Sequence, residues 1–164
     1  MPLFLVTLIA YLNGWIDTFM VGYLLDNYNV GLYNAALLTS QLLYLFPGMV
    51  LPLMMPVIGP YFARKQFFEV NSIVRQITKW IYAVNFFVLI LLIAFPDTIV
   101  RIIFGEKYLG SVPALVILAI GFFIHVLVSL VISFLELHKR TRLILFNILL
   151  TLMINIILNL VLIP

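Results

Sequence analysis

Long apolar stretches make up most of this chain, and short polar connections separate them. An α-helix of about 20 apolar residues is long enough to cross the roughly 30 Å hydrocarbon layer of a membrane. Residues 143–163 form the clearest stretch, since they carry no charge and follow a basic cluster. The pattern predicts five membrane-crossing helices in a single domain over residues 1–164, at about 3–25, 32–62, 80–95, 112–137 and 143–163.

Two details modify this set of helices. The polar stretch 63–79 keeps apolar residues at helical spacing, which predicts an amphipathic helix at about 65–78 in the membrane interface. The predicted helix 32–62 contains Pro47, Pro52, Pro56 and Pro60. An interior proline removes a backbone donor and bends a helix. We therefore expect helix 32–62 to be kinked, either as a static bend or as a mobile element beside a cavity.

Polar residues form stripes on three of the predicted helices. An amide in hydrocarbon loses its hydrogen bonds to water, so such a stripe must face a neighbouring helix or an aqueous cavity. We interpret the stripes as the wall of a hydrated substrate path; the alternative is hydrogen bonding between packed helices. The candidate path residues are Asn13, Asp17, Ser129, Asn147, Thr151, Asn155 and Asn159.

Asp17 and His125 are candidates for coupling transport to an ion. A carboxylate at the bilayer centre costs at least about 2.5–3.5 kcal/mol on insertion scales, so Asp17 needs a polar partner, a polar interior or a proton. The unperturbed pKa of histidine lies near physiological pH, which suits His125 to proton transfer. The alternative readings are a structural partner for Asp17 and a neutral hydrogen-bonding role for His125.

The composition places the chain among integral membrane proteins. It has 65% hydrophobic and 9% charged residues and a mean hydropathy of +1.24. The net charge of +3 comes from basic residues in connections, so topology explains it and nucleic acid is not an expected partner. Without cysteine, disulfides and thiolate metal sites are excluded. Glu69 and Glu136 are far apart in sequence, so we expect no metal, no cofactor and no enzyme activity.

The connections also predict an orientation. Seven Lys and Arg residues fall on one side of the predicted membrane and two, Arg101 and Lys107, on the other. Basic residues favour the cytoplasmic side, so we expect a cytoplasmic N-terminus and a C-terminus outside. Five crossings, an odd number, are typical of part of a larger protein.

Several short motifs, taken in order, carry a family resemblance. They are Asp17 with Met20-Val21-Gly22-Tyr23, Val30-Gly31-Leu32-Tyr33 with Ala35-Ala36, Pro52, Pro56, Phe104-Gly105 with Tyr108, Ile117-Leu118, Asn155, Leu158-Asn159 and Leu162-Ile163-Pro164. In this order the chain resembles the second half of a polysaccharide flippase of the multidrug/oligosaccharidyl-lipid/polysaccharide exporter superfamily.

The resemblance implies a MATE-like fold with two helix bundles around a cavity, of which this chain supplies the first five helices of the second six-helix bundle. It implies translocation of a polyprenyl-diphosphate-linked oligosaccharide across the cytoplasmic membrane. The implied partners are this lipid-linked oligosaccharide, membrane lipids, and a missing N-terminal helix bundle or a second copy of the chain. Cation or multidrug efflux, and a non-transporting membrane scaffold, are the alternative functions.

Overall fold

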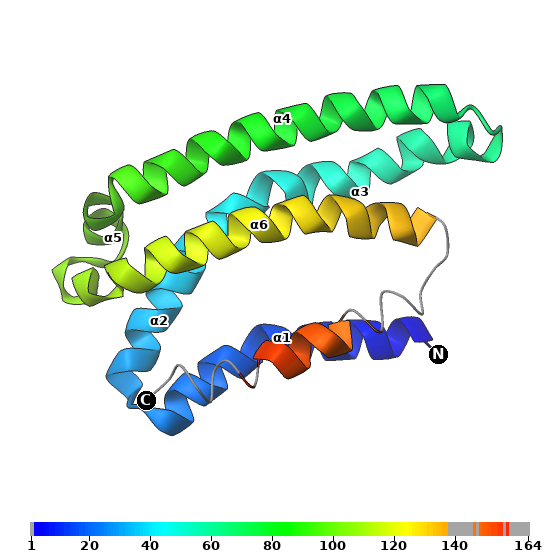
Figure 1. Cartoon of the computed structure of the whole chain (residues 1–164). Helices are drawn as coiled ribbons and strands as arrows, with labels where there is room; N and C mark the ends of the chain where they lie inside the picture. Colours follow the sequence, from blue (N-terminus) through cyan, green and yellow to red (C-terminus); the bar gives the residue numbers. More distant parts are fainter. Residues whose placement is uncertain (1, 138–145, 147, 156, 158–164) are drawn as a thin grey trace. The chain divides into compact units, whose positions relative to one another are not determined.

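The computed structural model describes residues 2–137, 146, 148–155 and 157 (Figure 1). Regular structure in these residues is helical, so the all-α prediction is confirmed. Three of the described helices are long and apolar enough to cross a membrane, at Leu42–Ala63, Phe67–Ala94 and Glu106–Ser129. The chain is therefore an all-α, multi-pass membrane protein.

The helices follow one another with short connections. They are α1 (Pro2–Leu24), α2 (Asn27–Ser40), α3 (Leu42–Ala63), α4 (Phe67–Ala94), α5 (Pro96–Phe104), the 3-10 helix η1 (Glu106–Ser111) and α6 (Val112–Leu137). Residues 148–155 are helical too. Where we expected a single domain, the chain divides into two compact units. The terminal unit comprises residues 1–34 and 134–164, and the central unit comprises residues 35–133.

The turn between α1 and α2 is shorter than the sequence pattern suggested. The carboxylate of Asp26 accepts a hydrogen bond from the backbone N–H of Asn29 at 2.9 Å and another from the Asn29 side chain at 2.8 Å. A carboxylate in this position satisfies a free N–H in the first helical turn. The helix therefore begins at Asn27, five residues before the expected start at 32.

The expected helix 32–62 is wrong as a single element, because α2 ends at Ser40 and α3 begins at Leu42. The prolines that suggested a kink all lie within α3, which stays helical through them. The break lies instead after Thr39 and Ser40, whose hydroxyls donate to the carbonyls of Ala35 (2.7 Å) and Leu37 (2.8 Å). Side-chain hydrogen bonds of this kind compete with the helical backbone ladder and bend helices.

The separate interfacial helix at 65–78 is also wrong, since α4 runs unbroken from Phe67 to Ala94. Its buried residues fall three, four or seven positions apart along one stripe: Val70, Val74, Ile81, Asn85, Leu89 and Leu92. A stripe with this spacing keeps one face of a helix against its neighbours from end to end. The polar first half of α4 is thus continuous with its apolar second half.

Within the central unit, α3 and α4 form an antiparallel hairpin and α6 packs against both (Figure 1). One buried cluster joins Leu43 of α3, Leu89 and Leu92 of α4, and Ala119 of α6. A second cluster joins Ala36 of α2, Val100 of α5 and Leu115 of α6. These clusters fix the end of α2 and the start of α3 against α6.

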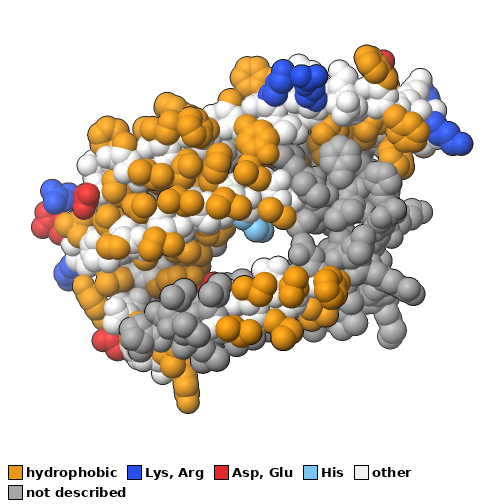
Figure 2. Space-filling view, viewed as in Figure 1, with side chains coloured by type: hydrophobic (Ala, Val, Ile, Leu, Met, Phe, Trp, Pro, Cys, Tyr) orange, Lys and Arg blue, Asp and Glu red, His pale blue; other side chains and the backbone are white. Residues whose placement is uncertain are grey.

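Charged and apolar side chains occupy different parts of the surface of the central unit. Figure 2 shows hydrophobic side chains over the middle of the helices, with Lys and Arg side chains at the α3–α4 turn, along the start of α4 and near α5. The exposed apolar residues include Phe86, Phe87 and Ile117. Apolar side chains around the middle of a helix and charges towards the ends are the distribution expected of a membrane-spanning bundle.

Candidate functional site

A polar cluster in the terminal unit contains the central candidate of the sequence analysis. The helices α1 and α2 meet across a two-residue connection, and Val30 packs closely on Gly22. A Cβ atom on Gly22 would lie 3.3 Å from Cγ2 of Val30, so the glycine permits this close approach. The approach brings Asp17 and Thr18 of α1 opposite residues of α2.

Asp17 receives hydrogen bonds from two other parts of the chain. The side-chain amide of Asn155 donates to Oδ1 of Asp17 at 2.8 Å, although the two residues are 138 positions apart. The hydroxyl of Tyr33 donates to the same carboxylate. Hydrogen bonds to an ionised acceptor are stronger than neutral ones. The carboxylate thus links α1, α2 and the helical residues 148–155.

A second polar contact lies beside the first. The hydroxyl of Thr18 and Oδ1 of Asn34 are 3.3 Å apart, with the hydroxyl as donor. Asp17, Thr18, Tyr33, Asn34 and Asn155 are each partly buried. We call these five residues the Asp17 cluster.

The Asp17 cluster can hold a negative charge among apolar helices. An amide and a phenol donate to the carboxylate, which offsets part of its loss of water. A proton or a cation at Asp17 would compete with those donors for the same oxygens. Binding at the carboxylate would therefore change how three helical segments are held together.

The structure brings together two of the predicted path residues, Asp17 and Asn155. Thr151, one turn before Asn155, is exposed. The side chain of Asn13, and the residues Asn147 and Asn159, lie outside the part of the chain whose side chains are described. The assignment of these six residues to a path stays a prediction.

Ser129 and His125 belong to the central unit. Ser129 is buried, and its hydroxyl donates to the carbonyl of Val126 in its own helix at 2.8 Å. His125 is exposed and contacts the rings of Tyr44 and Phe122. Among the residues that the structure describes, no three His, Asp or Glu side chains group as metal ligands.

Tyr33, Thr18 and Asn34 were not identified as site residues from the sequence. A signal for them was present, because a short connection between antiparallel helices places residues at similar distances from the turn opposite one another. Asp17 and Thr18 precede Asp26 by nine and eight positions, and Tyr33 and Asn34 follow it by seven and eight. Reading the two helices as a hairpin would have paired them.

Comparison with known proteins identifies the family. Residues 1–113, from α1 into the start of α6, match the model of a family described as polysaccharide biosynthesis protein. The teichuronic acid biosynthesis protein TuaB of Bacillus subtilis (strain 168) is 31% identical over 126 residues.

The match to TuaB covers 74% of this chain and 25% of that protein, so the chain spans about a quarter of its relative's length. No solved structure matches the chain. The family match confirms the resemblance to polysaccharide flippases read from the sequence motifs. The chain is therefore a multi-pass membrane protein that belongs to the polysaccharide biosynthesis protein family.

Proposed function

We propose that the chain is part of a flippase that moves a polyprenyl-diphosphate-linked oligosaccharide from the cytoplasmic to the outer leaflet of the cell membrane. The observation that carries the proposal is the Asp17 cluster, a carboxylate hydrogen-bonded to Tyr33 and Asn155 among apolar helices. A charge at membrane depth is costly and usually marks a substrate or ion pathway. The family's role in polysaccharide biosynthesis supplies the class of cargo.

In the proposed mechanism no covalent bond is made or broken, and no cofactor takes part. The helices alternate between arrangements open to each side, and the sugar hydroxyls cross beside polar side chains while the lipid tail stays in the bilayer. A cation or proton at Asp17 displaces the donors of Tyr33 and Asn155 and so biases one arrangement. His125 is a second candidate for coupling.

Two further elements belong to the proposal. Because the chain spans about a quarter of TuaB, transport would require further helices, supplied by an N-terminal bundle or a second copy of this chain. The polar paths of such transporters lie at the interface between related bundles. In the proposed orientation, the N-terminus and the basic residues at the α3–α4 turn would lie in the cytoplasm.

The test is deletion of the gene in its native host. Deletion is expected to leave the lipid-linked oligosaccharide in the inner leaflet and to lower the amount of surface polysaccharide. Re-expression of the wild-type gene should restore both, and the gene with Asp17→Asn should not. The matched control is Asp26→Asn, which removes a carboxylate from the same hairpin but keeps a good helix cap.

The alternatives make different predictions for the same strains. Loss of resistance to cationic dyes, with normal surface polysaccharide, would assign the chain to cation efflux. A scaffold role would make Asp17→Asn lower the yield of inserted protein, because the cluster would then act only in helix packing. Normal yield with lost transport supports the flippase.

A further inference from the structure

A pocket in the central unit lies beside the break between α2 and α3. Its volume is about 580 Å³, within the range of about 300–1,000 Å³ typical of small-molecule sites. Gln41 lines it at the break, Tyr44, Leu45, Gly48 and Met49 line it from α3, and Phe122 and His125 line it from α6. The Asp17 cluster contributes none of the described lining residues.

The helix break sets one wall of the pocket. The chain resumes its helix after Gln41, where the backbone N–H of Tyr44 donates to the Gln41 carbonyl at 2.8 Å. Gln41, just before α3, and Tyr44 and Gly48 within it follow one another at spacings of three and four residues, which place them on the same side of the helix. A Cβ atom on Gly48 would lie 3.4 Å from Cε1 of Tyr44, so the tyrosine ring lies over the glycine.

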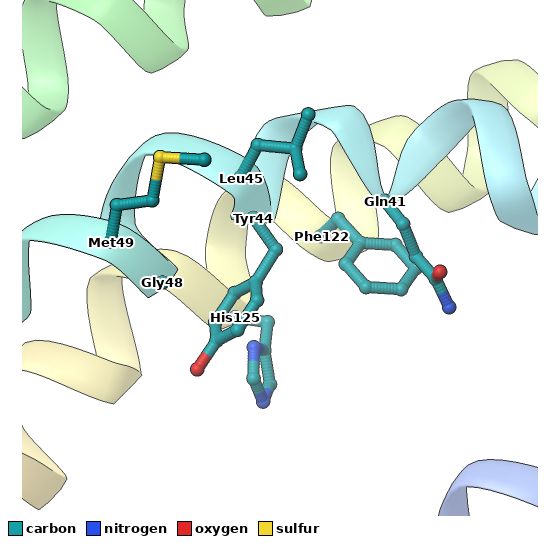
Figure 3. A pocket seen from close by; sticks show the side chains of 7 residues that line it. All are labelled: Gln41, Tyr44, Leu45, Gly48, Met49, Phe122 and His125. Carbon is teal, nitrogen blue, oxygen red and sulfur yellow. The ribbon is translucent and has the colours of Figure 1, made fainter. Parts of the chain in front are cut away.

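Aromatic rings form the second feature. The ring centroids of Tyr44 and His125 are 5.9 Å apart with planes at 57°, and those of Phe122 and His125 are 6.4 Å apart at 64°. Figure 3 shows Gln41, Tyr44, Phe122 and His125 extending to the same side of the helices, with the Tyr44 hydroxyl next to the imidazole. Tilted rings leave parts of their faces open to a ligand.

The polar groups of the pocket can act as both hydrogen-bond donors and acceptors. The Gln41 amide and the Tyr44 hydroxyl both donate and accept, and imidazole can do the same. None of the described lining residues is Lys, Arg, Asp or Glu. The described lining therefore offers no cation to bind a diphosphate, and it offers more hydrogen-bonding groups than a prenyl chain can use.

We propose that this pocket binds a neutral sugar ring of the transported glycan. One face of a pyranose presents C–H bonds with partial positive charge, which complements the negative face of an aromatic ring. Hydroxyl groups around the ring edge pair with the amide, phenol and imidazole. Gln41, Tyr44 and His125 are the residues that recognise the sugar, with Phe122 as an apolar wall. That the sugar belongs to a transported glycan rests on the proposed function.

The experiment measures sugar binding by the whole chain in lipid nanodiscs, without transport. Ligand-observed NMR is recorded with N-acetylglucosamine and, separately, with farnesol. N-acetylglucosamine is expected to bind the wild-type chain, and Tyr44→Ala is expected to weaken binding by about tenfold through the lost ring contact. Gly48→Leu should abolish binding, because its side chain fills the space beside Tyr44.

Matched variants separate recognition from folding. Tyr61→Ala removes a partly exposed tyrosine of the same helix outside the pocket and should bind as the wild type does. Tyr44→Phe and Gln41→Leu keep the shape and remove single hydrogen-bonding groups, so each should weaken binding by several-fold. Circular dichroism confirms that each variant keeps its helices.

Two results would overturn the inference. One is sugar binding unchanged in Tyr44→Ala and Gly48→Leu. The other is Tyr44-dependent binding of farnesol without sugar binding, which would assign the pocket to the lipid tail. The outcome is separable from the proposed function: sugar binding without oligosaccharide accumulation in the deletion strain refutes the flippase alone, and accumulation without sugar binding refutes the pocket alone.

Discussion

At the scale of single residues, the contact between Asp17 and Asn155 shows how a costly side chain is accommodated in an apolar helix. Asn155 and Tyr33 supply donors to the carboxylate from distant parts of the sequence. A hydrogen bond between membrane helices stabilises a protein less than the same bond would in isolation, because the polar groups of separated helices also find hydrogen-bond partners.

A double-mutant cycle measures this contact. Asp17→Ala and Asn155→Ala should each destabilise the chain, and the double variant should lose less than their sum. We expect a coupling energy of about 0.6 kcal/mol, the average for hydrogen bonds within membranes, and at most about 1.7 kcal/mol. Reversible unfolding in mixed micelles gives the free energies. Strictly additive losses would mean that the two side chains do not interact.

Two glycines of α1 offer a matched pair. A Cβ atom meets nothing within 4 Å at Gly14, whereas at Gly22 it would meet Cγ2 of Val30 at 3.3 Å. Gly14→Ala should stabilise the chain by about 0.5–1 kcal/mol through reduced backbone entropy. Gly22→Ala should lose that gain because Val30 must shift. Equal gains at both sites, measured by thermal unfolding in micelles, would show that α1 and α2 do not pack here.

At the scale of the elements, the α3–α4 turn closes with the pattern of a Schellman motif. The N–H of Gln66 donates to the Tyr61 carbonyl at 2.9 Å, and the N–H of Lys65 donates to the Phe62 carbonyl at 3.1 Å. Lys65 takes the left-handed conformation with φ of 59°, a position usually filled by glycine. A side chain in this conformation costs about 1–2 kcal/mol.

Lys65→Gly is therefore expected to stabilise the hairpin by about 1 kcal/mol, as measured by thermal unfolding of the chain in micelles. The control is Lys65→Ala, which removes the same charge but keeps a Cβ atom. It should leave stability nearly unchanged. If both variants gain equally, the charge rather than the backbone conformation is responsible.

Hydrophobic patterning predicted the helical class and most of the apolar spans, because a long uncharged stretch in a membrane must satisfy its backbone hydrogen bonds internally, as a helix does. It placed the α2–α3 break wrongly, because prolines are the stronger general signal for a kink. Here the buried Thr39 and Ser40 donate side-chain hydrogen bonds to carbonyls of the preceding turn. Their effect depends on side-chain rotamers that composition does not reveal.

The polar start of α4 was misread for a related reason. Charged residues and helical spacing suggested a separate interfacial helix, yet the buried stripe from Val70 to Leu92 keeps the same face through both halves. Of the Asp17 cluster, the sequence identified Asp17 and Asn155 from their cost in a membrane. It did not pair them, since a contact over 138 positions depends on tertiary packing.

At the scale of the whole molecule, the charges of the central unit predict which end faces the cytoplasm. Arg64, Lys65, Arg75 and Lys79 lie at the α3–α4 turn and along the start of α4. Arg101 and Lys107 lie in α5 and η1, beyond the other end of α4. The 28 residues of α4 span about 42 Å, more than the hydrocarbon layer, so Arg64 and Lys65 before it fall on the opposite side of the membrane from Arg101 and Lys107 after it.

Single cysteines can test this orientation directly, because the natural sequence has none. Arg64 and Lys107 are both exposed, so Arg64→Cys and Lys107→Cys should each give a reactive thiol. Since basic residues favour the cytoplasmic side, a membrane-impermeant maleimide should label Lys107→Cys in intact cells and leave Arg64→Cys unlabelled. Permeabilised cells are the control, in which both should react. Labelling of Arg64→Cys alone in intact cells would invert the predicted orientation of the central unit.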